Sequence, residues 1–216
     1  LFYCKLKLKY NYLIIMNHSK IMHLTCKNKN NIDNPIWRKC LEEYRKIYKD
    51  YEIKIYDNND IYNIVLKYYP KYYKDIKCIK IGAILADIFR YLILYLEGGI
   101  YSDLDCEPLK KIDKLLEENE GISTLVCFEM EPIYMNQRLK NNVKIHHPAI
   151  PKYNCQICQW FMISEPKQTL FLEMFEYTIS KIPALIYNER LFKTRKNNYI
   201  RNIISVTGPS GFTDIV

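Results

Sequence analysis

The sequence predicts an α/β domain in which helices flank a central sheet. Short segments rich in β-branched and aromatic residues alternate with longer segments of helical periodicity, which is the pattern of such folds. The chain has 216 residues, of which 49% are hydrophobic, and this is enough for one domain with a sizeable core. It contains neither a Gly-x-Gly-x-x-Gly fingerprint nor a P-loop, and no internal repeat or linker. We therefore expect one α/β domain of another kind.

Hydrophobic periodicity and capping residues place the elements. The expected strands cover residues 20–25, 51–56, 100–105, 125–128 and 160–164, and the expected helices cover residues 35–49, 57–69, 82–97 and 167–181. Asp33 or Asn34 is the N-cap of the first helix, and the run Asp57–Asp60 caps the second. Pro70 ends the second helix, and we expect the last helix to end before Pro183.

The helix over Gly82–Glu97 is apolar on nearly all sides, so we expect it to be buried. Gly98 and Gly99 supply its C-terminal stop. Asp87 and Arg90 lie three residues apart and share one face of this helix. Two interpretations are open: a simple ion pair within the helix, or two charged side chains that are buried because they hold a ligand.

The strand after the two glycines carries two carboxylates. Strand side chains alternate, so Tyr101, Asp103 and Asp105 point to one face. Two converging carboxylates repel each other unless a cation lies between them, and hard oxygen ligands favour Mg²⁺ or Mn²⁺ with substrate phosphates. A calcium EF-hand is excluded, because Pro108 and Lys114 occupy the loop positions that need Gly and Glu. The pattern predicts a divalent cation that holds a diphosphate.

These residues resemble the sugar-binding region of glycosyltransferase family 32. The family includes fungal outer-chain and sphingolipid mannosyltransferases and is more distantly similar to the glucosylating domains of large clostridial toxins. The matching segments run in order from residue 20 to residue 216: Lys20–Thr25, Ala86–Tyr91, Gly98–Tyr101, Asp103–Asp105, Cys158–Ser164 and Thr207–Asp214. The resemblance implies a GT-A fold with a mixed central sheet flanked by helices.

The resemblance also implies roles for the donor-binding residues. Asp87 would orient ribose or sugar hydroxyls, and Arg90 would donate hydrogen bonds to phosphate or sugar. Tyr101, Trp160 and Gly208 would also bind the donor. The loop that contains Gly208 has two glycines and a proline, so we expect a shaped turn near the metal site, although an ordinary tight turn is the alternative.

Asp103 and Asp105 are the expected metal ligands and catalytic residues, with Mn²⁺ or Mg²⁺ as cofactor. Asp105 would hold the metal, and Asp103 would ligate it directly or through water. The expected reaction moves a hexose from a nucleotide sugar to a hydroxyl of a glycan, lipid or protein, with retention of anomeric configuration. Family likeness favours GDP-mannose as donor, followed by UDP-glucose and UDP-galactose. No residue is assigned as nucleophile.

The chain departs from the family at two places. The family usually has a Trp shortly after the first strand, where it stacks on the base, but Cys26 stands there and a tyrosine is the expected substitute. Enzymes of this fold also draw a further metal or phosphate contact, often a His, from beyond the segment where this sequence ends. We expect residues 1–19 to be a leader that is disordered or untranslated. We expect residues 20–216 to form the glycosyltransferase domain. This domain is truncated unless another residue supplies the further metal or phosphate contact.

Charge and cysteine content limit the partners. The net charge is +8, but the Lys and Arg residues are scattered, so nucleic acid is not an expected partner, whereas an anionic donor or a peripheral membrane contact is. The eight cysteines are dispersed, and Cys155 and Cys158 lack the second pair that zinc needs. Reduced core thiols predict a cytoplasmic protein, or a Golgi-lumen protein if an upstream anchor is missing.

The sequence of residues 130–154 predicts a long loop over the site.

Two other functions are considered. A haloacid-dehalogenase-type phosphatase also places Asp-x-Asp after an apolar strand, but Cys106-Glu107-Pro108 is not the sequence that follows it there. A degenerate, non-catalytic sugar- or nucleotide-binding relative is the main alternative, because of Cys26 and the end of the chain at Val216. Metal-dependent hydrolysis of a nucleotide sugar, measured beside an aryl phosphate, separates the three.

Overall fold

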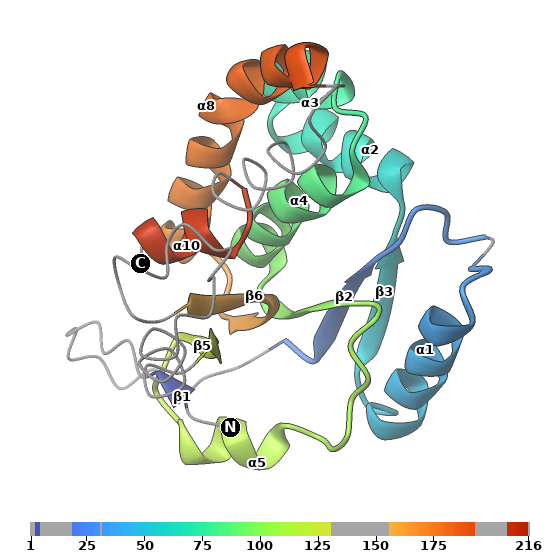
Figure 1. The fold of residues 1–216 in the computed structure, drawn as a ribbon. Helices are drawn as coiled ribbons and strands as arrows, with labels where there is room; N and C mark the ends of the chain where they lie inside the picture. The colour runs from blue at the N-terminus through green and yellow to red at the C-terminus, as the bar shows by residue number, and fades with distance from the viewer. Residues whose placement is uncertain (1–2, 5–18, 31, 131–155, 193–206, 216) are drawn as a thin grey trace, which may run out of the picture.

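The computed structural model describes residues 3–4, 19–30, 32–130, 156–192 and 207–215 (Figure 1). The strands are β1 (Tyr3–Cys4), β2 (Ile21–Thr25), β3 (Glu52–Tyr56), β4 (Gly99–Asp103), β5 (Thr124–Met130) and β6 (Gln156–Ser164). The helices are α1 (Pro35–Ile47), α2 (Asn58–Tyr68), the 3₁₀ turn η1 (Pro70–Tyr72), α3 (Tyr73–Lys77), α4 (Gly82–Glu97), α5 (Asp113–Glu118), α8 (Thr169–Phe192) and α10 (Pro209–Ile215). The expected loop over residues 130–154 lies, apart from Met130, outside the described residues.

The strands described form one mixed sheet in the order β1-β5-β6-β4-β2-β3. β2 pairs in parallel with both β3 and β4, whereas β6 pairs antiparallel with β4 and β5. Tyr3 and Cys4, which lie in the expected leader, pair antiparallel with β5. The parallel strands β2 and β4 therefore end side by side, with Thr25 opposite Asp103.

The sheet separates two hydrophobic cores. One contains α4 with parts of α2, α3 and α8, and the other contains α1 with parts of α5. Alternation along β4 divides its side chains between the two, because Tyr101 packs in the first core and Ile100 in the second. The face of β4 that carries Tyr101 and Asp103 is therefore the face that meets α4.

The expected helix caps and stops are mostly present. Asn34 caps α1 through a hydrogen bond from the Ile36 N–H, and Asp57 forms a capping box with Asp60 at the start of α2. The expectation that the last helix ends before Pro183 is wrong: α8 continues through Pro183 to residue 192. Pro183 itself is exposed on this helix.

Gly98 and Gly99 turn the chain from α4 into β4. They have φ of 65° and 88°, which is the region that favours glycine. A Cβ on Gly98 would lie 2.6 Å from the Pro166 nitrogen, and one on Gly99 would lie 2.6 Å from the Ile21 carbonyl oxygen. Because both neighbours are backbone atoms, this close approach fixes the end of α4 against β2 and β6.

His23 of β2 supports the same turn. Its ring is buried, with Nε2 lying 2.9 Å from the Gly98 carbonyl oxygen and Nδ1 lying 3.0 Å from the Tyr56 hydroxyl oxygen. A carbonyl oxygen can only accept, so Nε2 carries the proton, and Nδ1 accepts from the tyrosine. Burial lowers the pKa of His23 to about 4, and the ring therefore stays neutral at pH 7.

Candidate functional site

Arg90 is the centre of the site. It lies on the face of α4 that meets β4, and its side chain is 5% exposed. Nη2 lies 3.0 Å from Oδ1 of Asp87 and 3.2 Å from Oδ1 of Asp103, while Nη1 donates to the Gln159 carbonyl oxygen at 2.8 Å. The guanidinium carbon lies 4.8 Å from the centre of the Tyr101 ring. Arg90 therefore joins α4 to both β4 and β6.

Asp103 is held in place by two donors. Besides Arg90, the Tyr101 hydroxyl donates to its Oδ1 at 2.9 Å. The same hydroxyl oxygen lies 3.0 Å from Oγ1 of Thr25, at the end of the neighbouring strand β2. The Asp103 side chain is 30% exposed, so one side of the carboxylate meets protein while the other reaches solvent.

Asp105 reaches the site from a turn. The structure ends β4 at Asp103, so the expected strand over residues 100–105 is two residues too long. The Cys106 N–H bonds the Asp103 carbonyl oxygen at 3.1 Å and begins a turn in which Asp105 is exposed. Among the described residues Asp105 forms no ion pair. It is the less engaged of the two carboxylates.

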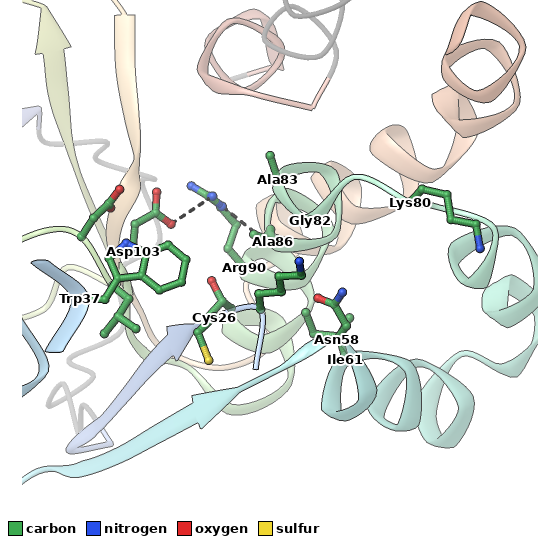
Figure 2. Close-up of a pocket in the computed structure, with 14 residues that line it drawn as sticks. Cys26, Trp37, Asn58, Ile61, Lys80, Gly82, Ala83, Ala86, Arg90 and Asp103 are labelled. Carbon is green, nitrogen blue, oxygen red and sulfur yellow. Dashed lines mark hydrogen bonds and ion pairs between the residues drawn. The ribbon is translucent and has the colours of Figure 1, made fainter. Parts of the chain in front are cut away.

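A cavity of about 510 Å³ brings these groups together (Figure 2). Its lining residues come from the ends of β2 and β4 and from α1, α2 and α4: Thr25, Cys26, Lys27, Trp37, Asn58, Ile61, Lys80, Gly82, Ala83, Ala86, Arg90, Asp103, Leu104 and Asp105. In Figure 2, Arg90 and Asp103 point toward one another, Trp37 lies on the side of Asp103, and Lys80 lies on the opposite side. The cavity is therefore acidic at one end and basic at the other.

Asp103 and Asp105 fit a divalent cation. Both carboxylates line one cavity and offer hard oxygen atoms, and Mg²⁺ and Mn²⁺ typically take one or two protein carboxylates with water and substrate phosphate. Within the described ranges, no group of three or more His, Cys, Asp or Glu side chains gathers to hold a metal. The pair therefore suits a cation that a bound diphosphate helps to hold, rather than an all-protein metal cage.

Asp87 lies behind Arg90 and does not line the cavity. Its Oδ1 accepts from Gln159 Nε2 at 3.1 Å, and its Oδ2 accepts from Thr207 Oγ1 at 2.6 Å. Burial raises the pKa of Asp87 to about 6, although the charge of Arg90 and the hydrogen bond from Thr207 act to lower it. The expected direct contact of Asp87 with the donor stays a prediction.

Two of the expected donor-binding residues lie away from this cavity. Trp160 is 37% exposed and lines a second cavity of about 640 Å³ with Tyr44, Cys106 and Phe161, on the face of the sheet that α1 covers. Gly208 is buried beside Thr207, and the predicted turn is shorter than the sequence indicates, because α10 begins at Pro209. Thr207, by contrast, touches the site through Asp87.

The cavity also contains residues that the sequence did not single out. Trp37 of α1 is the aromatic residue among the described residues that line the cavity, and Cys26 lines it too. The expected stacking of a tyrosine on the base stays a prediction. Lys27 and Lys80 line it without an acidic partner in the described part of the chain, and Asn58 adds an amide. The sequence marks Trp37 only as an aromatic residue near the Pro at the start of a helix. Such a residue usually packs in a hydrophobic core, so the sequence alone does not predict its place in the cavity.

The fold and this site resemble those of glycosyltransferase domains. Residues 35–122 match the family described as glycosyltransferase sugar-binding region containing DXD motif. The expected resemblance to glycosyltransferase family 32 is confirmed by this match. The PaToxG glycosyltransferase structure has a TM-score of 0.52 and 16% identity with this chain, and covers 92% of this chain and 68% of that one. This likeness supports the GT-A-like fold.

Curated relatives come from yeasts. The initiation-specific alpha-1,6-mannosyltransferase of Schizosaccharomyces pombe is 28% identical over 137 residues, which is 61% of this chain and 30% of the relative. The protein of that name from Candida albicans is 28% identical over 144 residues, or 61% and 33%. Inositol phosphoceramide mannosyltransferase 3 of S. pombe is 32% identical over 111 residues, or 50% and 31%. The chain thus spans about a third of the length of these relatives.

None of the helices in the described ranges combines the length and the apolar sequence of a membrane-spanning segment.

Proposed function

We propose that this chain is the donor-binding domain of a metal-dependent, retaining hexosyltransferase that uses a nucleotide sugar. One observation carries the proposal: Arg90 is fixed between Asp87 and Asp103 at the wall of a cavity that Asp105 also lines. The buried guanidinium of Arg90 lies beside the partly exposed carboxylate of Asp103, and the exposed carboxylate of Asp105 lines the same cavity. These groups suit a ligand that carries a diphosphate and sugar hydroxyls. The family match and the mannosyltransferase relatives support the same assignment.

Asp105 and the solvent-facing side of Asp103 would hold Mn²⁺ or Mg²⁺. When bound, the cation would neutralise the negative charge that develops on the leaving diphosphate. Asp103 lies at the Trp37 side of the cavity, which Asp105 also lines, so the diphosphate would lie there, with the rest of the donor extending toward Asn58 and Lys80. This orientation would bring the scissile bond close to Arg90.

The protein's own groups would orient the donor. Arg90 keeps its guanidinium aligned through Asp87, Asp103 and the Gln159 carbonyl oxygen, so little conformational entropy is lost when it donates to an oxygen of the donor. Tyr101 fixes Asp103 by donating to it, and so acts behind the reacting atoms. The acceptor hydroxyl would attack the anomeric carbon while the nucleoside diphosphate leaves, and we assign no residue as nucleophile.

Mannose is the sugar we propose, because mannosyltransferases from two yeasts align with 61% of the chain. GDP-mannose is therefore the first donor to test, before UDP-glucose and UDP-galactose. The acceptor is a hydroxyl of a glycan, lipid or protein. The cytoplasmic location stays a prediction.

Hydrolysis of the donor tests this function without an acceptor. We expect the purified chain to release mannose from GDP-mannose with Mn²⁺ and to stop when EDTA is added, while an aryl phosphate remains intact. Aryl-phosphate hydrolysis would favour the phosphatase alternative. Binding of GDP or UDP without hydrolysis of any of the three donors would favour a non-catalytic relative.

A further inference from the structure

The Asp87 carboxylate contacts donors from three segments of the chain. A carboxylate has about four acceptor positions, and three of them are filled here. Gln159 of β6 and Arg90 of α4 both bond Oδ1, and Thr207, just before α10, bonds Oδ2. Asp87 is 5% exposed, so water does not replace these donors readily. The direction of the carboxylate is therefore set by Gln159 and Thr207 as well as by Arg90.

Tyr91 contacts both Gln159 and Thr207. Its hydroxyl oxygen lies 2.7 Å from Gln159 Oε1, to which it donates its one proton, and 3.3 Å from the Thr207 carbonyl oxygen. Gln159 Oε1 is thus the acceptor toward Tyr91, which leaves its Nε2 as the donor toward Asp87. The Tyr91 ring also stacks on Phe212 of α10, with the ring centres 5.6 Å apart. The segment from Thr207 onwards is therefore tied to α4 at the level of Asp87.

Gln159 forms hydrogen bonds to the site through both its side chain and its backbone. Its side-chain amide donates to Asp87, and its backbone carbonyl oxygen accepts from Arg90 Nη1 at 2.8 Å. β6 thus fixes the distance between the carboxylate and the guanidinium. Arg90 in turn bonds Asp103, at the acidic end of the cavity.

We propose that Gln159 and Thr207 are positioning residues for the transfer reaction, which hold Asp87, and through it Arg90, in the orientation that the donor needs. This inference rests on the proposed function for its catalytic meaning. The hydrogen-bond chain itself is a property of the unliganded protein, and it can be tested without any donor.

Thr207→Val tests the chain with a change of one hydroxyl to a methyl group. Thr178→Val is the matched control, because Thr178 of α8 is also fully buried but its hydroxyl has no hydrogen-bond partner among the described residues. Thr207→Ser keeps the hydroxyl and should restore wild-type behaviour. The comparison separates loss of the bond to Asp87 from the general cost of changing a buried threonine.

The pH dependence of the melting temperature is the first readout. Asp87 has a pKa of about 6 in the folded chain, above its usual value, so its ionisation lowers stability as the pH rises through 4 to 6. The charged or titratable groups that face it are Arg90, Tyr91 and Asp103. Loss of the Thr207 donor raises the pKa further, so the cost of Thr207→Val grows between pH 5 and pH 8.

We expect Thr207→Val to lower the melting temperature by roughly 3–10 °C more at pH 8 than at pH 5. For Thr178→Val and for Thr207→Ser, the difference in melting temperature from wild type should be the same at pH 5 as at pH 8. With Mn²⁺ present, Thr207→Val should also weaken GDP or UDP binding, measured by calorimetry, about tenfold relative to Thr178→Val.

A Thr207→Val cost that is equal at pH 5 and pH 8, with nucleotide binding like that of Thr178→Val, would overturn the inference. If Thr207→Val does not fold, Gln159→Leu is measured in the same way, since it removes the other donor to Asp87. Failure of the wild-type chain to hydrolyse any donor would count against the proposed function alone, because the melting data need no donor.

Discussion

Arg90 and Asp103 form an ion pair between α4 and β4, with Nη2 lying 3.2 Å from Oδ1, and Asp87 holds the same nitrogen from the other side at 3.0 Å. The pair of Asp87 and Arg90 is therefore more than an ion pair within one helix. The Asp87–Arg90 pair links Gln159 and Thr207, from the C-terminal half of the chain, to Asp103 on β4, the first candidate metal ligand.

Loss of the Arg90 charge should be costly to the fold. Arg90→Met leaves Asp87 buried without its cation, and we expect the free energy of unfolding to fall by about 3–5 kcal/mol in urea titrations. Arg90→Lys should restore only part of it, because a lysine cannot donate to Asp87, Asp103 and the Gln159 carbonyl with one fixed geometry. Equal stability of Arg90→Met and wild type would show that the charge is not needed.

The double variant Asp87→Asn with Arg90→Gln separates structure from donor binding. It removes both charges together, so it should be more stable than Arg90→Met, since no unpaired buried carboxylate remains. Donor hydrolysis should nevertheless fall by the equivalent of about 2–4 kcal/mol in transition-state stabilisation. Near wild-type turnover in this variant would leave only the structural role of the pair.

Trp37 should report donor binding directly. The chain has two tryptophans, and Trp160 lines the other cavity. In the variant Trp160→Phe, GDP or UDP with Mn²⁺ should quench or shift the remaining indole fluorescence, whereas Trp37→Phe should show little change. Trp37→Ala should weaken nucleotide binding by about 1–3 kcal/mol if its ring stacks on the ligand. A signal that comes from Trp160 instead would place the nucleotide in the second cavity.

His23 should make part of the stability depend on pH. Its pKa is lowered to about 4 in the folded chain from a usual 6.5, so the unfolded chain takes up the proton first as the pH falls. Its contribution is therefore complete above pH 6.5 and is lost between pH 6.5 and 4, and it amounts to roughly 3 kcal/mol. Urea titrations of His23→Phe should show a flatter decline over this range than wild type. Parallel declines in the two proteins would refute a neutral buried ring.

Local chemistry made much of the fold predictable. The bounds of α4 follow from its apolar sequence and from the two glycines, and the caps of α1 and α2 follow from Asn34 and Asp57. The continuation of α8 through Pro183 and the start of α10 at Pro209 were not predictable in this way. Tertiary packing decides them, and the sequence near each proline is compatible with a helix end.

The site was predictable where one motif contains it. Asp87, Arg90, Tyr101 and Asp103 meet because a helix and the following strand are joined by a tight glycine turn. The parts that come from distant segments were not predictable as contacts. Neither the placement of Trp37 in the cavity nor the bonds from Gln159 and Thr207 to Asp87 has a periodic signal, because each depends on how separate elements pack.

Asp105→Asn gives the most direct test of the account. Asp105 is exposed and makes no ion pair with a described residue, so the change should leave the free energy of unfolding of the metal-free protein within about 0.5 kcal/mol of wild type. We predict that Mn²⁺ with GDP or UDP raises the melting temperature of wild type but not of Asp105→Asn, and that only wild type hydrolyses GDP-mannose. An equal Mn²⁺-dependent shift in both proteins, or none in wild type, would contradict a metal-held donor at this site.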